Sequence, residues 1–393
     1  MADIFKKFGL RRIVNVSGTE TERGGTPVCA EVVAAVSELV PNSVNMTELQ
    51  SAANQIIASA FGCESGCISG CTAASIAISV GATMTGSDMG LVEQLPDTSG
   101  MRNEVIMQKG HEVTYGQNVS QNVRVTGARV IEIGAATECS VYQLQNAITP
   151  QTTAALYVVS HLTVQNKHID LKIFCDVCHQ AGVPVIVDAA SQSDPQKYVS
   201  AGADLILVST QKSFGGLTGG IIAGRKDLVQ ACMYQQHGIG RSMKAGKETV
   251  ISAIAAIERW MATDWDKQIM QLRGRMERAV ENLNNINGIA ASILKSQILL
   301  EVSEKEAGLR AYQLAQALRL RTPSIIVWDH FAMANELRIT LRLVTDEESD
   351  YVCNSIAEIM TSKNHQTSDA IPLNPGDRML AELAQWPPQL NPE

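Results

Sequence analysis

Short apolar segments alternate with amphipathic segments over the first two thirds of the chain, and few folds accommodate such an alternation. Several of the short segments are almost entirely apolar, which is typical of strands in a sheet covered on both faces. The expected strands lie at residues 104–108, 129–133, 154–159, 184–188, 204–209 and 220–223. Helical periodicity occupies residues 47–61, 171–181 and 247–263. Strands that alternate with helices predict an α/β fold built on a parallel sheet.

The expected helix at 47–61 carries its own start and stop signals. Thr47 and Gln50 have the spacing of a capping box, and Gly62 follows the last helical residue. A capping box satisfies amide groups at the start of a helix, and glycine adopts the left-handed conformation with which many helices end. Gly182 ends the helix at 171–181 in the same way.

The last third of the chain has a different pattern, which predicts a smaller α+β domain. A turn-like stretch at 284–289 is followed by expected strands at 297–302, 325–328 and 336–343 and by expected helices at 305–320 and 347–361. The end of the chain is rich in Pro, Asn and Gln, which favours an extended arm.

We therefore expect four parts along the chain. The first, residues 1–45, is an N-terminal segment that contributes to the small domain and to the mouth of the active site. The large domain follows at 46–260, the small C-terminal domain at 261–365 and the C-terminal tail at 366–393.

Composition restricts the class of protein and its partners. Only 18% of the 393 residues are charged, which favours burial of surface in a homo-oligomer. The net charge of -8 argues against a protein that binds nucleic acid regardless of sequence, because such proteins need a basic face. The N-terminus has no apolar run typical of a signal peptide, and the weakly polar stretch 68–84 is interrupted by Gly, Ser and Thr. That stretch is more typical of a buried helix than of a membrane span.

The nine cysteines are an odd number without a repeating framework, which favours reduced thiols and a cytoplasmic protein. Cys63, Cys67 and Cys71 are spaced four residues apart, and Cys175 and Cys178 three apart. Neither group has the spacing of a zinc site, so we expect no metal and interpret these residues as small buried apolar side chains.

Three segments carry residues suited to chemistry, and each also has a purely structural interpretation. Asp188 ends an apolar strand, where the strands of an open parallel sheet face the ligand crevice, although a turn-forming Asp would look the same. Lys212 follows the next apolar strand, and a lysine removed from water can become a nucleophilic amine, although many such lysines are simply solvated. The third segment, Ser69 to Ser75, opens an apolar helix with small residues that could either bind an anion or pack closely.

Together these segments predict a site for pyridoxal 5'-phosphate. Lys212 would bind the aldehyde of the cofactor, and Asp188 would pair with its protonated ring nitrogen. The phosphate would be held by the turn at Gly70 and by hydroxyl or backbone groups nearby, for which the candidates are Ser69, Cys71, Thr72, Ser209 and Thr210.

Seven stretches resemble one family of enzymes in sequence and in order along the chain. They are IVNVSGTETERGG, SGCTAASIA, QKGHEVTYG, VSHLTVQ, VPVIVDAAS, ADLILVSTQKSFGGLTGGIIAGRKDL and GIGRSMKAGKE. The chain thereby resembles fold-type I pyridoxal-phosphate enzymes, in the branch of bacterial selenocysteine synthase and the D-glucosaminate-6-phosphate ammonia-lyases. The resemblance is close over about residues 5–260 and looser beyond.

Of these two groups, the ammonia-lyases match more of the motifs. Their pattern agrees with Lys109-Gly110-His111, with the stretch 160–165 and with the stretch 238–248. Selenocysteine synthases carry a further N-terminal domain that grips transfer RNA, whereas here the Val14-Asn15 segment begins almost at once, so we expect no nucleic-acid partner. One departure is Thr210-Gln211 before the lysine, where the ammonia-lyases have smaller residues, which puts the identity of the substrate in doubt.

The resemblance implies a large domain with a mainly parallel seven-stranded sheet and a smaller α+β domain. It also implies elimination of water and release of ammonia from a 2-amino-3-hydroxy sugar acid, giving a 2-keto-3-deoxy acid. Replacement at the β-carbon, racemisation and a non-catalytic role in assembly stay open, because one scaffold supports many reactions.

The remaining candidates are histidines and basic residues. His111 and His161 follow strands and could contact the cofactor or substrate, or be structural. Arg338 and Arg342 lie on one face of a strand, where one could clamp a substrate carboxylate or both could form salt bridges. The other candidates for an anionic small-molecule substrate are Arg23, Arg241, Lys244 and Lys247.

Overall fold

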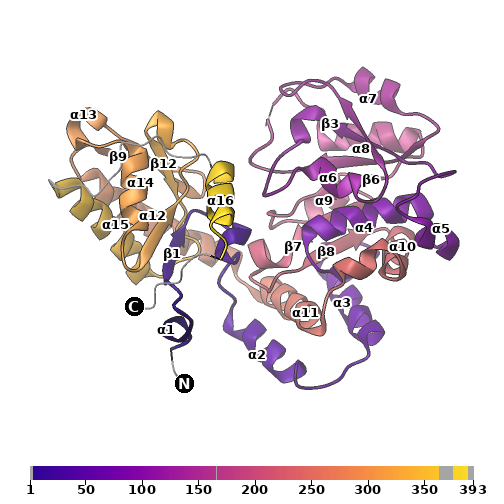
Figure 1. Cartoon of the computed structure of the whole chain (residues 1–393), viewed down its shortest axis with the longest axis horizontal. Coiled ribbons are helices and arrows are strands. Elements are labelled where there is room, and N and C mark those ends of the chain that lie inside the picture. The colour runs from indigo at the N-terminus through magenta and orange to yellow at the C-terminus, as the bar shows by residue number, and fades with distance from the viewer. Residues whose placement is uncertain (1–2, 165, 363–374, 388–393) are drawn as a thin grey trace. The chain divides into compact units, whose positions relative to one another are not determined.

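The computed structural model describes residues 3–164, 166–362 and 375–387. The chain forms two compact units (Figure 1): unit 1 comprises Met1–Gly24 and Asp264–Glu393, and unit 2 comprises Gly25–Thr263. Residues 25–45, which we grouped with the N-terminal segment from sequence, therefore lie in unit 2. In the described residues, no helix is long and apolar enough to cross a membrane.

Unit 2 is built on a seven-stranded sheet. Its strands, in spatial order, are β2 (Ser65–Ser69), β8 (Gly220–Gly224), β7 (Leu205–Ser209), β6 (Val185–Asp188), β5 (Thr152–Val158), β3 (Glu104–Gln108) and β4 (Arg129–Ile133). Neighbours from β7 to β4 are parallel, and β8 is antiparallel to both β7 and β2. The prediction of a mainly parallel α/β sheet is confirmed.

Helices cover both faces of this sheet, which explains why its strands are almost entirely apolar. On one face, a core contains Ile57, Phe174 and Ile257 from α3 (Met46–Phe61), α8 (Leu171–Gln180) and α11 (Lys247–Ala262). On the other face, a second core contains side chains of α4 (Thr72–Thr85), α6 (Val119–Arg124) and α10 (Lys226–Tyr234). Neighbouring residues of one strand, such as Val105 and Ile106, point into different cores.

Two local predictions in unit 2 are corrected by the structure. The cap of α3 is Asn45, whose side chain accepts hydrogen bonds from the amides of Thr47 and Glu48, so the predicted capping box is wrong. The stretch 68–84 is not one helix, because its start belongs to β2 and α4 begins only at Thr72. The small residues of β2 gave it little of the apolar, β-branched character that marks a strand.

Unit 1 contains two small sheets and their covering helices. β1 (Ile13–Val16) pairs in parallel with β11 (Ser324–Val327), and β10 (Gln297–Val302) lies between β9 (Ile289–Leu294) and β12 (Glu336–Ile339) in an antiparallel sheet. Helices α12 (Trp265–Asn284), α14 (Ala311–Arg319) and α15 (Asp346–Thr361) contribute to their core.

The expected elements of unit 1 differ from the structure in several places. The helix expected at 305–320 is interrupted, because α13 (Glu304–Ala307) ends at Gly308 in the left-handed conformation and α14 begins afterwards. The strand expected at 336–343 ends at Ile339, and β1 and β9 were not predicted as strands. Helix α16 (Pro375–Ala384) lies in the tail that we expected to be extended, and the rest of the tail is mostly outside the described residues.

Candidate active site

Asp188 is the last residue of β6 and lies buried at the carboxyl edge of the sheet in unit 2. Burial raises the pKa of its carboxyl group to about 6, although the amide of Ala190 and the positive charge of Lys212 act in the opposite direction. The Oδ1 atom accepts a hydrogen bond of 3.2 Å from the Ala190 amide. A cationic group beside this carboxylate would hold it in the ionised form.

Lys212 lies in a π-helical turn, η3 (Thr210–Phe214), directly after β7. Because β7 is the parallel neighbour of β6, the turn follows the same edge of the sheet as Asp188. The turn is fixed from outside: the amide and hydroxyl of Thr26 both donate to the Gln211 carbonyl at 2.9 Å. Gly25 adopts a φ of +77°, and a Cβ there would lie 2.7 Å from the same oxygen. A π-turn at this position is typical of functional sites.

The start of α4 provides unpaired donors for an anion. Cys71 is its N-cap, and the first α-helical hydrogen bond joins the Ser75 amide to the Cys71 carbonyl at 2.9 Å, so the amides before Ser75 precede the helical ladder. The Cys71 thiol accepts from the amide of Ala74. The Thr72 hydroxyl is buried and has no hydrogen-bond partner among the described residues. An orphaned hydroxyl beside open amides fits the phosphate of pyridoxal phosphate.

Gly70 makes a backbone contact that the sequence did not suggest. Its amide donates to the Met243 carbonyl at 3.0 Å, and a Cβ at this position would lie 2.9 Å from the same atom. The residue thus lets two backbones meet. It joins the start of α4 to η5 (Ile239–Met243), the segment that carries the basic residues.

The hydroxyl groups of Ser69 and Thr210 stabilise the scaffold. The Ser69 Oγ atom lies 2.7 Å from the Ser75 Oγ atom and 3.0 Å from the Cys71 carbonyl oxygen. Thr210 is fully buried, and its hydroxyl donates to the Gly219 carbonyl at 3.1 Å. Ser209 is also buried, and its amide donates to the Ala190 carbonyl at 3.0 Å. These contacts favour Thr72 over Ser69 and Thr210 as the phosphate ligand.

His111 is 2% exposed and has partners on both sides of its ring. Its Nδ1 atom accepts from the Val158 amide at 3.1 Å, and its Nε2 atom lies 3.3 Å from the side chain of Gln108. The ring packs edge-on against Tyr157, and burial, followed by the influence of His168, lowers the pKa of His111 to about 3. These contacts favour the structural interpretation, which the sequence left open.

Tyr115 is a residue that the sequence analysis missed. It lies in the loop between β3 and α6, and Asn122 donates a hydrogen bond to its hydroxyl group. Surrounding protein atoms, and then the negative charges of Asp188 and Cys71, raise the pKa of Tyr115. The phenol therefore lies within electrostatic range of both the β6 edge and the α4 start. The signal available in the sequence was its position in the motif QKGHEVTYG, between Gly110 and Gly116.

The basic candidates fall into two groups. Arg241 and Lys244 are exposed in unit 2, beside the contact between Gly70 and Met243. Lys247 instead donates from its Nζ atom to the Asn42 carbonyl, a role in joining loops. His161 follows β5 and is exposed.

Three arginines that we expected to bind substrate lie in unit 1. Arg338 packs its guanidinium over Trp328, 4.6 Å from the ring centroid, and donates to Glu336 at 2.9 Å. Arg342 is exposed, and Arg23 is partly buried. The structure thus groups Asp188, Lys212 and the α4 start in one unit and these arginines in the other.

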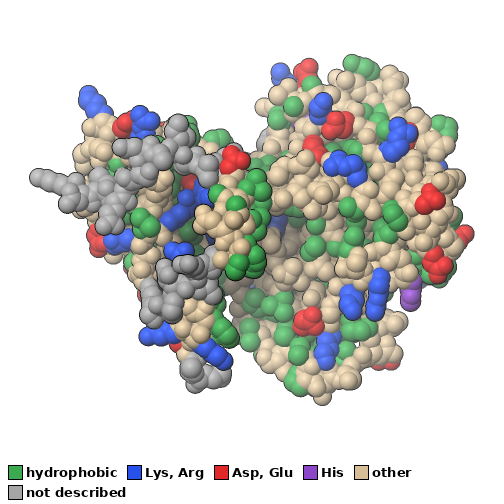
Figure 2. Space-filling model, viewed as in Figure 1, with side chains coloured by type: hydrophobic (Ala, Val, Ile, Leu, Met, Phe, Trp, Pro, Cys, Tyr) green, Lys and Arg blue, Asp and Glu red, His purple; other side chains and the backbone are tan. Residues whose placement is uncertain are grey.

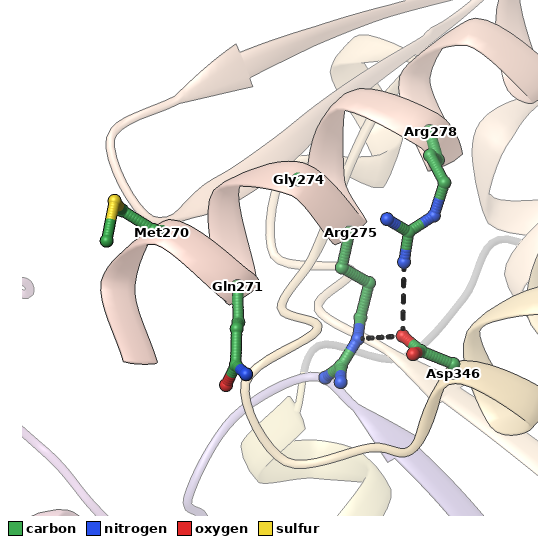
Figure 3. Close-up of a pocket in the computed structure, with 6 residues that line it drawn as sticks. All are labelled: Met270, Gln271, Gly274, Arg275, Arg278 and Asp346. Atoms are coloured by element: carbon green, nitrogen blue, oxygen red, sulfur yellow. Dashed lines mark hydrogen bonds and ion pairs between the residues drawn. The ribbon is translucent and has the colours of Figure 1, made fainter. Parts of the chain in front are cut away.

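A separate pocket of about 490 Å³ lies in unit 1 and carries none of the predicted residues (Figure 3). Arg275 and Arg278 extend from α12 toward Asp346, with ion-pair distances of 2.7 and 3.3 Å. Arg275 also donates to the carbonyls of Leu341 and Val344, so it joins α12 to the start of α15. We interpret these contacts as structural. No cluster of His, Cys, Asp and Glu suited to a metal ion occurs among the described residues, and all nine cysteines are free.

The chain is similar to known proteins over most of its length. The family model "Aminotransferase class I and II" matches residues 157–356. A D-glucosaminate-6-phosphate ammonia lyase of Salmonella typhimurium is 33% identical, over 81% of this chain and 87% of that protein. A solved structure of D-glucosaminate-6-phosphate ammonia-lyase superposes with a TM-score of 0.84 at 32% identity, covering 92% of this chain and 99% of the other.

Two further relatives have different names. A 5'-C-glycyluridine monooxygenase-decarboxylase of Streptomyces sp. is 32% identical over 91% of this chain and 92% of its own length. An L-seryl-tRNA(Sec) selenium transferase of Aquifex aeolicus is 22% identical over 90% of this chain and 85% of its own length.

Proposed function

The chain belongs to the fold-type I pyridoxal-phosphate enzymes of the aminotransferase class I and II family, and from this premise we propose that it is an ammonia-lyase. Its proposed substrate is a 2-amino-3-hydroxy sugar acid such as D-glucosaminate 6-phosphate. The reaction eliminates water across the α- and β-carbons, and hydrolysis then consumes one water and releases ammonia. The product is a 2-keto-3-deoxy acid. One observation carries the proposal: Asp188 and Lys212 share one sheet edge in a chain related to such a lyase.

The cofactor, when bound, supplies an aldehyde that reacts with amines and a pyridine ring that accepts the electron pair left by the α-proton. The buried carboxylate of Asp188 would keep the ring nitrogen protonated. The amine of Lys212 would hold the aldehyde at rest and, once displaced by the substrate amine, would take the proton from the α-carbon. Thr72 and the amides at the start of α4 would hold the phosphate.

The other residues have supporting roles in this proposal. Tyr115 would border the cofactor ring, because it lies within electrostatic range of Asp188. Arg241 and Lys244 would attract an anionic group toward the start of α4. Arg338 or Arg342 would bind the substrate carboxylate, and Arg23 is a further candidate for that role. His161 stays a candidate for contact with the substrate.

The activity is tested by supplying D-glucosaminate 6-phosphate to the purified, cofactor-loaded protein and measuring ammonia and 2-keto acid together. The proposal predicts that both products form in equal amounts and that Lys212→Ala forms neither. Formation of keto acid without ammonia, or of neither product, contradicts it.

A second candidate function is oxygen-dependent decarboxylation, which is favoured by the identity to the glycyluridine monooxygenase-decarboxylase over 91% of the chain. Oxygen uptake with release of carbon dioxide, and no release of ammonia, would favour it over the lyase. Replacement at the β-carbon or racemisation would give neither pattern, and a non-catalytic assembly protein would turn over nothing.

We further propose that the protein acts in the cytoplasm, in the catabolism of amino sugar acids, as a homo-oligomer. The low fraction of charged residues supports the oligomer, because it favours buried subunit surfaces. Size-exclusion chromatography with light scattering tests this, and a monomer at micromolar concentration would contradict it.

A further inference from the structure

A cluster of arginines in unit 1 surrounds one carboxylate. Asp329 follows β11, and its Oδ2 atom accepts from Arg319 at 2.6 Å and from Arg378 at 3.1 Å. Arg319 ends α14, and Arg378 belongs to α16. The side chains of Asp329, Arg319 and Arg378 are 13%, 24% and 23% exposed. These contacts thus lie partly out of water, where charges interact more strongly than at an open surface.

Arg23 supplies a third positive charge that acts on Arg319. It ends η1 (Thr21–Arg23), its side chain is 23% exposed, and its ion pair with Glu22 is long, at 3.9 Å. Several influences act on the pKa of Arg319. Burial lowers this pKa most, Asp329 raises it, and the positive charges of Arg378 and Arg23 each lower it further. Of these charged neighbours of Arg319, one is a carboxylate and two are guanidinium groups.

Like charges held together in a partly buried place repel each other, and an anion bound among them would relieve that repulsion. Figure 2 shows Lys and Arg side chains gathered on unit 1 beside α16. Guanidinium groups donate in a fixed planar fork that matches the oxygens of phosphate. We propose that Arg23, Arg319 and Arg378 form a binding site for a phosphate group, with Asp329 as the residue that positions the guanidinium groups.

Phosphate fits this cluster better than a carboxylate does. A phosphate monoester carries about two negative charges near neutral pH and offers three acceptor oxygens, whereas a carboxylate carries one charge and two oxygens. Three guanidinium groups thus match the three acceptor oxygens of one phosphate in number. The charge of Asp329 is already compensated by Arg319 and Arg378, so it repels an incoming anion less than an unpaired carboxylate would.

The phosphate could belong to the substrate or arrive as a separate ion, and the two sources share the same chemistry. If it belongs to the substrate, the inference rests on the proposed function. The existence of the site in unit 1 does not depend on that function, so binding and turnover are measured separately.

The test is calorimetric titration of inorganic phosphate into the cofactor-loaded protein, in which the cofactor's own phosphate site is filled. We expect binding that weakens at least about 10-fold in Arg319→Gln and in Arg23→Gln, since each variant removes charged hydrogen bonds to the ligand. The matched control is Arg321→Gln, two residues beyond Arg319, which removes one partly exposed arginine paired with Glu358. We expect its affinity to stay within about twofold of the wild type.

A second variant separates binding from damage to the fold. Asp329→Asn removes the negative charge beside the ligand but keeps an oxygen that can accept from the arginines. It is therefore expected to tighten phosphate binding, an effect that loss of structure does not produce. The proposal is overturned if the wild type takes up no phosphate in unit 1, if Arg319→Gln binds as tightly as Arg321→Gln, or if Asp329→Asn weakens binding as the arginine variants do.

Kinetics then identify the source of the phosphate. The site belongs to the substrate if inorganic phosphate competes with D-glucosaminate 6-phosphate, and if Arg319→Gln both abolishes this competition and raises the KM for the substrate. Inhibition or activation that is not competitive assigns it to a separate ion. A protein that binds phosphate as predicted but forms no keto acid refutes the proposed function and leaves the site standing.

Discussion

The buried carboxylate of Asp188 leads to a prediction about stability that is independent of catalysis. Its pKa is about 6 in the folded protein and 3.8 in the reference state, so the folded protein holds this proton more tightly than the unfolded chain does. Between pH 4 and pH 6 the unfolded chain therefore releases it first, and the free energy of unfolding falls as the pH rises. A shift of about two pKa units corresponds to roughly 3 kcal/mol of folding stability, and this stability is lost as the pH rises through about 6.

The perturbation is Asp188→Asn in the cofactor-free protein. The variant has no carboxyl group to ionise at this position. The free energy of unfolding of the variant minus that of the wild type should therefore rise by up to roughly 3 kcal/mol between pH 4 and pH 7.5. The assay is urea unfolding of both proteins at half-unit steps from pH 4 to pH 8. Titrating groups that do not interact with Asp188 are common to the two proteins and cancel in the difference.

The control is Asp176→Asn, an exposed carboxylate on α8 that is ion-paired with Lys172. Its difference from the wild type should change by less than about 1 kcal/mol over the same range. A flat difference for Asp188→Asn would refute the reasoning, because it would mean that the folded protein does not disfavour this charge. Saturating cofactor should reverse the order, since a cation beside Asp188 stabilises the ionised form only in the wild type.

Three further changes test the site around Asp188. Thr72→Val should weaken binding of pyridoxal phosphate about 10-fold with little change in stability, measured by fluorescence titration, because it removes an orphaned hydroxyl. Ser69→Ala should lower the free energy of unfolding by about 1–2 kcal/mol and leave cofactor affinity nearly unchanged, because the Ser69 hydroxyl bonds to Ser75. A large loss of cofactor affinity would instead make Ser69 a ligand. Tyr115→Ala should weaken cofactor binding by at least about 5-fold whereas Tyr115→Phe should not, if the ring rather than the hydroxyl borders the cofactor; equal losses in both would contradict that role.

The sequence was sufficient for features that depend on local pattern. The apolar strands that end at Asp188 and Ser209 were predictable because both faces of the sheet are covered, and the residues that follow them necessarily lie at its carboxyl edge. The strands β1, β2 and β9 were missed, because they are short or poor in β-branched residues and are stabilised by pairing with distant strands.

The roles of individual hydroxyl and basic groups depend on contacts between distant parts of the chain. Ser69 and Thr210 looked like phosphate ligands until their partners near Gly219 and Gly220 were known. Gly70 looked like part of an anion turn, but its amide meets the Met243 carbonyl, more than 170 residues away in sequence. The arginines that contact Asp329, and Arg23, whose charge acts on Arg319, come from three separate segments and form no motif.

The central claim is that Lys212 binds pyridoxal phosphate covalently beside Asp188. The most direct test is to load the purified protein with the cofactor, reduce it with borohydride and locate the modified residue by peptide mass spectrometry. The account predicts an absorbance band near the edge of the visible range that disappears on reduction, with the cofactor's mass fixed on the peptide containing Lys212 and on none in Lys212→Ala. Absence of the band, or modification of another lysine at the same stoichiometry in both proteins, would contradict it.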